Sequence, residues 1–314
     1  LPIQFADYAL WQRDALGDES DAQSVLGRQL AYWQRRLDGL PDVLVLPTDR
    51  PRPADSSYRG AEHHFSIPAP VAEQIAALAQ REAGTPFMVV HAALAALLAR
   101  LSATDDIAIA TPVAGRGQAV LDGLIGMFVN TLVLRTAVPS GASFAELLAA
   151  VKQVDLDAFA NADVPFESVV DAVAPIRSAA FAPLAQVILA FDPAGSIAHL
   201  DAEVDGLHVE QIDPTVVPAQ VDLTVRVHSA PAGEPWTGSL VYATDLFDGA
   251  SIAVLVERFL ALLGSVTADP STVVGDVDVL TAAEAERLAL MPVPRVSGGG
   301  RSLVELFAGS ATAF

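Results

Sequence analysis

The sequence predicts an α/β fold, in the wider sense that includes α+β, with a mixed β-sheet packed by helices. Apolar residues recur at helical spacing in several segments, while other segments alternate or run continuously apolar as strands do. QVILAF (186–191) is an almost unbroken apolar run, which indicates a strand covered on both faces; VDLTVRVH (221–228) alternates and should be half exposed. The chain has 314 residues and is 52% hydrophobic, so it can bury a continuous core.

Helices and strands intermix along the first half of the chain. Residues 22–39 place apolar side chains on one helical stripe that stops at Gly39, and Thr85 and Pro86 supply the N-cap and first position of another helix. In chain order we expect a helix over 22–39, a surface loop at LPTDRPRP (46–53), a strand over 58–67, helices over 70–83 and from 86 to about 101, and a strand over 105–117 that ends in a turn.

The second half continues this mixture. In the strand over 221–228, Val221 should point inward with the other valines, whereas Asp222 should point outward. In chain order we expect a strand over 125–135, a helix from Ser143 to about Phe159, a helix opened by Pro165, strands over 186–191 and 221–228, a helix with Asp248 as its N-cap, a short helix after residue 280, and a Pro-, Gly- and Ser-rich linker around 292–300.

Composition excludes several classes of function. The net charge is −20, from 18 Lys plus Arg against 38 Asp plus Glu, so we expect no nucleic-acid partner. No apolar run reaches the roughly 18 residues that span a bilayer, and no signal peptide is visible, so the expected location is cytoplasmic and away from membranes. The chain has no cysteine for disulfides or thiolate metal sites. It starts at Leu1 without a Met, and we expect both ends to be cut from a longer protein.

Common catalytic signatures are absent from the sequence. We find no phosphate loop, dinucleotide fingerprint, GxSxG elbow or HExxH motif, and the six histidines do not cluster at metal-ligand spacing. His63 and His64 are adjacent on an expected strand and therefore point to opposite faces, which favours structural or surface roles. His91 lies on an apolar helical stripe, where a core histidine with a satisfied partner is expected. We therefore predict no metal site.

One asparagine stands out in IGMFVNTLVLR (125–135). If the segment is a strand, Phe128, Asn130 and Leu132 share one face, and the amide interrupts an apolar row. A buried amide without partners costs about 1–3 kcal/mol. Asn130 should therefore hold something specific.

The segment NADVPFESVVD (161–171) carries a second polar group of interest. Pro165 suits the start of a helix, and Glu167 in the first turn complements the helix dipole. Asn161 and Asp163 lead into this apolar element without such an explanation. Asp163 either satisfies free amides of the helix or faces a cleft, and the residues alone leave both alternatives open.

Taken in order, the motifs resemble the downstream half of nonribosomal peptide synthetase condensation domains. They are FADYALW, LPTDRPRP, YRGAEHHF, DDIAIATPVAGR, IGMFVNTLVLR, NADVPFE, LVYATDLFD and VLTAAEAERL, which together extend from Leu1 to about Leu290. The tail SLVELFAGSATAF resembles the opening of an adenylation domain. The resemblance is specific because order and spacing agree over nearly the whole chain.

The resemblance implies a fold like that of chloramphenicol acetyltransferase, in which two α/β lobes enclose a channel. It places residues 1–19 at the junction between lobes, 20–280 in the C-terminal lobe, 281–302 in a linker and 303–314 at the start of an adenylation domain. The family's catalytic motif HHxxxDG belongs to the first lobe and is missing here, because His63 and His64 are followed by FSIPA. We therefore expect no catalytic residue in this chain, and an isolated fragment that is inactive.

The implied reaction forms an amide between a donor acyl or peptidyl thioester and the amine of an acceptor aminoacyl thioester. Phosphopantetheine arms of upstream and downstream carrier domains would deliver both substrates, so no directly bound cofactor is expected. The other implied partners are the upstream condensation lobe and the adjacent adenylation domain. A wall that aligns two tethered reactants contributes to the rate through proximity.

The resemblance also names candidate channel or substrate-positioning residues. Asn130 matches the family's Asn near the reaction centre, where it would orient a substrate group or, alternatively, fasten the two lobes. Ala162 replaces the usual Gln of the motif that contains Asn161 and Asp163. The remaining matches are Arg177 in PIRSAAFAPL (175–184), where Ala180, Phe181 and Ala182 depart from the family pattern, and the supporting residues Asp7, Trp11, Arg116, Gly126, Pro165 and Glu167.

Two rival functions remain open at this point. A chain of the same fold could be a non-catalytic docking module that recruits carriers or a tailoring enzyme, and a degenerate histidine motif upstream would favour it. The chain could also belong to an epimerisation or other acyltransferase relative. The adenylation-like tail argues against epimerisation, because epimerisation domains normally end a module.

Overall fold

The computed structural model describes residues 3–117, 119–194, 203–204, 207–208 and 217–290, together with the single residues 302, 304 and 308. The chain divides into two compact units, Leu1–Val279 and Leu280–Phe314, which are described separately. Of the expected segment 303–314, all but residues 304 and 308 lie outside the described residues, as do residues 291–301 of the expected linker.

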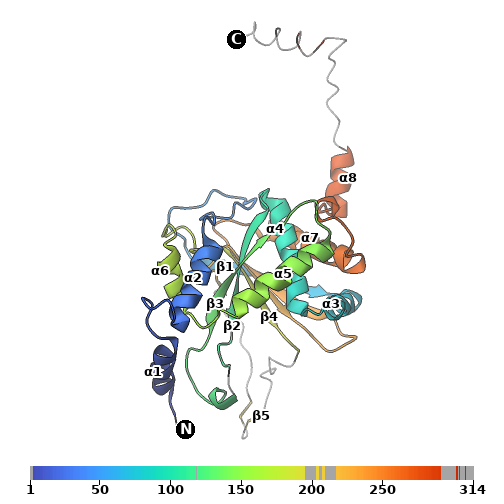
Figure 1. The fold of residues 1–314 in the computed structure, drawn as a ribbon. Helices are drawn as coiled ribbons and strands as arrows, with labels where there is room; N and C mark the ends of the chain where they lie inside the picture. Colours follow the sequence, from blue (N-terminus) through green and yellow to red (C-terminus); the bar gives the residue numbers. More distant parts are fainter. Residues whose placement is uncertain are drawn as a thin grey trace. The chain divides into compact units, whose positions relative to one another are not determined.

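A mixed sheet of seven strands forms the centre of the first unit (Figure 1). Its strand order is β3-β2-β4-β8-β9-β1-β7, with parallel pairing of β2 with β4 and of β4 with β8, and antiparallel pairing elsewhere. The strands are β1 (Arg59–Ile67), β2 (Asp106–Val113), β3 (Asn130–Ala137), β4 (Val187–Asp192), β7 (Val217–Pro218), β8 (Leu223–His228) and β9 (Trp236–Ala243), while β5 (Glu203–Val204) and β6 (Leu207–His208) form a separate pair.

Helices cover both faces of this sheet. Side chains of β2 alternate between the two layers: Ile107 and Ile109 join the core formed with α3, α4, α5 and α7, whereas Ala108 and Ala110 join the core formed with α2 and α6. The helices are α1 (Phe5–Leu16), α2 (Val25–Leu37), α3 (Ala69–Arg81), α4 (Pro86–Ser102), α5 (Phe144–Phe159), α6 (Phe166–Val173) and α7 (Gly249–Ala268), with short 3-10 turns η1 (Ala119–Leu121) and η2 (Val274–Asp276). The second unit contains α8 (Ala282–Leu290).

The pairing register defines two ends of the sheet. Val113 at the end of β2 pairs with Asn130 at the start of β3, and we call this the Asn130 end. Because β4 and β8 run parallel to β2, both start at the opposite end, beside Asp222, which we call the Asp222 end. Candidate residues can therefore be assigned to one end or the other.

The α/β prediction is confirmed, but the strand expected over 125–135 begins only at Asn130. Ile125, Met127 and Val129 are 92%, 77% and 56% exposed, so the apolar residues before Asn130 do not form a sheet face. Instead, Phe128 packs against aromatic rings of α1. Asn130 thus starts a strand and does not interrupt an apolar row. The segment 105–117 is a strand to Val113 followed by a turn, as expected.

The loop LPTDRPRP connects distant elements. Asp248 is the N-cap residue of α7, as expected, but its side chain makes no capping bond. Asp49 takes this role from the loop, because its carboxylate accepts from the Asp248 amide at 2.7 Å and from the Ser251 hydroxyl at 2.7 Å. These hydrogen bonds lower the pKa of Asp49.

Helix α7 is long and apolar enough to cross a membrane, and the bent pair α3 and α4 passes the same test only as a joined span. These criteria are also met by core helices of globular proteins. Ile252, Val256, Phe259 and Leu263 of α7 are buried in the large core, as the sequence stripe predicted.

Candidate functional site

Asn130 uses its whole side chain to hold a neighbouring segment. Nδ2 donates to the carbonyls of Ala162 at 2.9 Å and Val164 at 2.7 Å. Oδ1 accepts from the amides of Phe166 at 3.0 Å and Thr131 at 2.9 Å. A carboxamide has two donor hydrogens and two acceptor positions, so its capacity is taken up within this chain. A role for Asn130 toward substrate stays a prediction, and the geometry favours one exerted through the segment that it holds.

Gln29 on α2 holds the same segment from the other side. It is 7% exposed, and its Nε2 donates to Oδ2 of Asp163 at 2.8 Å. Its Oε1 accepts from the amides of Asp163 at 3.1 Å and Val164 at 3.2 Å. One turn further along α2, Nε1 of the buried Trp33 donates to the carbonyl of Asn161 at 2.9 Å. Sequence reasoning missed Gln29, although an amide four residues before Trp33 on a buried stripe was a readable signal.

We call residues 161–166 the clamped segment. It links α5 to α6, and several of its backbone groups form no hydrogen bond within a helix or strand, so they need other partners. Side chains from α2 and β3 supply those partners, so the segment is held by two elements of the second core layer. The arrangement fixes a loop without adding a charge.

The two polar residues predicted in this segment behave differently. The Nδ2 of Asn161 donates to the carbonyl of Asp157 at 2.8 Å and so closes the last turn of α5. Asp163 is exposed, and it makes no hydrogen bond with α6, whose first amide goes to Asn130. The helix-capping alternative for Asp163 is therefore wrong. Burial, and next the charge of Asp163, raise the pKa of Tyr8 on α1.

Several supporting residues meet in a small separate cluster, which we call the α1–loop unit: α1 with residues 114–129. Leu121, Leu124 and Phe128 form its buried core, with Ile3, Phe5 and Tyr8 packed against them. Gly126 lies where any side chain would collide with the ring of Phe5, and Arg116 stacks over Phe128 at 4.1 Å.

The other supporting residues are local. Asp7 closes a capping box at the start of α1, accepting from the Gln4 amide at 2.9 Å. Trp11 is exposed on α1. Pro165 is the N-cap residue of α6, and Glu167 lies in its first turn.

Arg177 follows α6 and pairs with Asp171 of that helix on the surface. Its ion pair goes to α6 and not to the clamped segment. Both side chains are mostly exposed, so this ion pair contributes little to stability. The predicted role of Arg177 in the channel remains a prediction.

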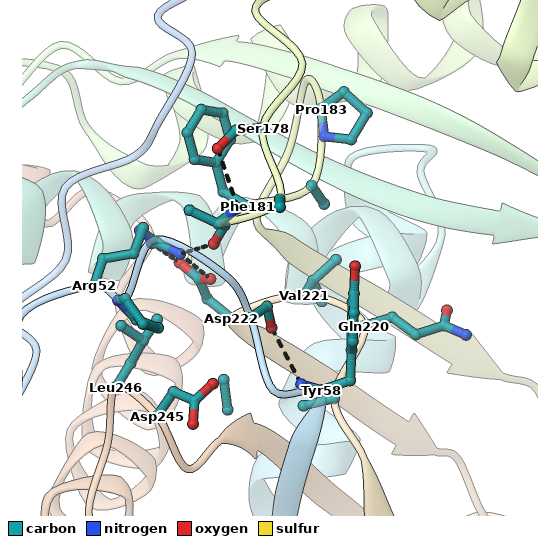
Figure 2. Close-up of a pocket in the computed structure, with 17 residues that line it drawn as sticks. Arg52, Tyr58, Ser178, Phe181, Pro183, Gln220, Val221, Asp222, Asp245 and Leu246 are labelled. Carbon is teal, nitrogen blue, oxygen red and sulfur yellow. Dashed lines mark hydrogen bonds and ion pairs between the residues drawn. The ribbon is translucent and has the colours of Figure 1, made fainter.

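Figure 2 shows a pocket at the Asp222 end, away from Asn130. Its volume is about 230 Å³, and residues 178–183 line one side of it. Arg52 forms a bidentate ion pair with Asp222 and donates to the carbonyl of Ala180 at 3.2 Å. Asp222 is buried, which corrects the outward position expected from alternation, because Arg52 of a distant loop covers it. Both oxygens of Asp245 accept from Ser57, which lowers the pKa of that carboxyl group.

His91 is a core histidine, as expected. Its Nδ1 lies 2.9 Å from Oδ1 of Asp155, and both residues are fully buried between α4 and α5. The Nε2 of His91 has no hydrogen-bond partner among the described residues. Among all residues that the structure describes, no group of three His, Asp or Glu side chains is arranged to hold a metal ion.

Comparison with known proteins places this geometry in one family. The family model for the condensation domain matches residues 1–289. The isonitrile lipopeptide synthase of Mycobacterium tuberculosis is 42% identical over 299 residues, which cover 92% of this chain and 12% of that protein. The dimodular nonribosomal peptide synthase of Bacillus subtilis is 40% identical over 289 residues, which cover 90% of this chain and 12% of that protein. The chain thus spans a small part of these relatives.

Solved structures agree with the family match. The X-domain from teicoplanin biosynthesis superimposes with a TM-score of 0.82 at 31% identity, covering 88% of this chain and 62% of that one. The four-domain nonribosomal peptide synthetase AB3403, solved with AMP and glycine, gives a TM-score of 0.77 at 26% identity, covering 90% of this chain and 22% of that one. A family match over residues 1–289, joined to this fold, means that the chain belongs to the condensation-domain family of nonribosomal peptide synthetases.

Proposed function

We propose that this chain is the C-terminal lobe of a condensation domain that forms an amide between two carrier-bound thioesters. The acceptor amine attacks the donor carbonyl, a C–N bond forms, the C–S bond of the donor breaks, and the amine proton leaves with the thiol. This chemistry requires neither a metal nor a redox cofactor. The family match and the missing HHxxxDG motif together support a lobe that depends on another part of the domain for its catalytic histidine.

The exposed apolar side chains of the α1–loop unit carry this proposal. Ile125, Met127 and Val129 project from its loop, and Leu10 and Trp11 project from α1. Clustered exposed apolar residues mark surfaces that another protein part covers. We propose that the upstream condensation lobe covers them, which places the substrate channel beside the Asn130 end.

The implied partners follow from this placement. Upstream and downstream carrier domains would deliver the thioesters on phosphopantetheine arms, with residues 281–302 as the linker and 303–314 as the start of an adenylation domain. In such an assembly the lobe contributes by holding two tethered reactants in line. We expect a cytoplasmic location and no nucleic-acid or membrane partner.

A reconstitution assay tests the proposal. Purified chain with loaded donor and acceptor carriers should form no amide above background, whereas the same chain expressed with the upstream lobe should form it. Amide formation by the chain alone would contradict the proposed division of labour. No amide from the reconstituted domain, with carriers shown to be loaded, would remove the enzymatic proposal.

A non-catalytic docking module is the alternative, and one observation favours it. A second structure of the teicoplanin X-domain, at 31% identity and a TM-score of 0.81, was solved as a complex with OxyB. A condensation-like fold can therefore bind another protein. A degenerate histidine motif upstream, with retention of a tailoring enzyme by the reconstituted domain, would favour this alternative over amide formation.

A further inference from the structure

We propose that Gln29 is a positioning residue, which orients Asp163 to hold an N–H group of the carrier-bound acceptor substrate. The proposal rests on the proposed function, and it adds to that function a residue on α2 outside every motif that identified the family. It starts from the fact that Gln29 is buried and Asp163 is exposed.

The first argument is the cost of an amide at position 29. Its neighbours on the buried side of α2 are Leu30, Trp33 and Leu37, and a leucine at position 29 would suit the same apolar layer. A buried amide is tolerated only when its donors and acceptors are paired. Among the described residues, the hydrogen bonds of the Gln29 side chain go to Asp163 and Val164, so the clamped segment is the structural reason for this amide.

The second argument is that Gln29 forms hydrogen bonds to both the backbone and the side chain of Asp163. The same carboxamide accepts from the backbone amide of Asp163 and donates to its side-chain Oδ2. Contacts to both backbone and side chain fix the orientation of the carboxylate. Asn130 and Trp33 fix the residues on either side, so the whole segment is held before any substrate arrives.

The third argument is that these hydrogen bonds from Gln29 leave the charge of Asp163 unneutralised. Gln29 is neutral and bonds one oxygen, and no cation pairs with Asp163 among the described residues. An ionised carboxylate only accepts hydrogen bonds, so its free oxygen is suited to an N–H or O–H donor. The charge of Asp163 also contributes to the raised pKa of Tyr8 in the α1–loop unit, the side at which we place the channel. The acceptor substrate carries such donors in its amine and in the amides of its phosphopantetheine arm.

The test uses the complete condensation domain within its synthetase and a Gln29→Leu variant, which keeps the volume and removes the amide. Gln34→Leu is the matched control, because Gln34 lies on the same helix and donates to Ala172, not to the clamped segment. Two quantities are measured: single-turnover amide formation against acceptor-carrier concentration, and affinity for the downstream carrier loaded with its amino acid through an amide in place of the thioester.

We expect Gln29→Leu to lower amide formation about tenfold, as small misplacements of positioning groups do, and to weaken binding of the loaded carrier but not of the empty one. Gln34→Leu should behave as wild type. Asp163→Asn should cause a similar loss, and the double variant should be no worse than Asp163→Asn alone, because both changes remove one function. If Gln29→Leu does not fold, the shorter Gln29→Asn carries the same expectation.

Wild-type rates and affinities in Gln29→Leu would overturn the proposal. Two other results would also overturn it. One is a double variant whose loss of rate equals the product of the two single losses. The other is a loss of rate in Gln29→Leu that equals the fraction of unfolded protein measured by thermal melts. If the wild-type domain forms no amide, the proposed function fails, yet the affinity measurement still decides the role of Gln29.

Discussion

The two ends of the sheet fix their loops by different chemistry. At the Asp222 end, carboxylates do the holding, and Asp49, Asp222 and Asp245 each have both oxygens bonded. At the Asn130 end, neutral side chains hold the loop, and Asp163 keeps one oxygen free. Carboxylates that fix a loop have both oxygens occupied by hydrogen bonds or ion pairs. Amides can fix a loop and leave an oxygen of a nearby carboxylate free to accept from another molecule.

We expect the largest effect on stability from removing the buried ion pair at the Asp222 end. Arg52→Ala would leave Asp222 buried without its partner, and such changes typically destabilise proteins by about 3–5 kcal/mol. Urea unfolding of the chain measures the loss. Arg177→Ala is the control, because its ion pair with Asp171 is exposed, and it should cost at most about 1 kcal/mol. Equal losses in the two variants would refute the distinction between these ion pairs.

Removing the neutral hydrogen bonds at the Asn130 end should lower the free energy of unfolding less, and its effects should stay near the clamped segment. Asn130→Ala leaves two carbonyls and the first amide of α6 without their partner, with an expected loss of about 2 kcal/mol. Hydrogen exchange should accelerate at Phe166 and at the amides held by Gln29, while the core strands keep their protection. Uniform acceleration across the sheet would instead indicate that Asn130 supports the whole fold.

The smallest effect concerns pH. Hydrogen bonds from Asp248 and Ser251 lower the pKa of Asp49 in the folded chain below its unfolded value of about 4. Its stabilising contribution is therefore present above that value and disappears as the pH falls through the folded pKa. In Asp49→Asn, the melting temperature should fall less steeply with acid than in wild type. An unchanged slope would mean that Asp49 does not titrate with folding.

The sequence predicted repeating local patterns well and distant contacts poorly. Spacing located α2, α4 and α5, because apolar stripes reflect burial directly. Alternation failed at Met127 and Val129, which belong to an exposed surface, and at Asp222, whose ion pair comes from a loop 170 residues away. Motif resemblance pointed to Asn130 and Asp163, but the link between them through Gln29 depends on contacts across 134 residues.

The α1–loop unit has a further consequence for the energetics of the free lobe. Helix α1 has no buried residue, and its aromatic cluster is separate from both cores of the sheet. It can therefore open as its own cooperative unit, at a free energy far below that of global unfolding. A partner that binds only the closed form would raise this opening free energy with the logarithm of its concentration, once that concentration exceeds the dissociation constant. Proteolytic nicking between residues 5 and 16 would then report occupancy of the neighbouring surface.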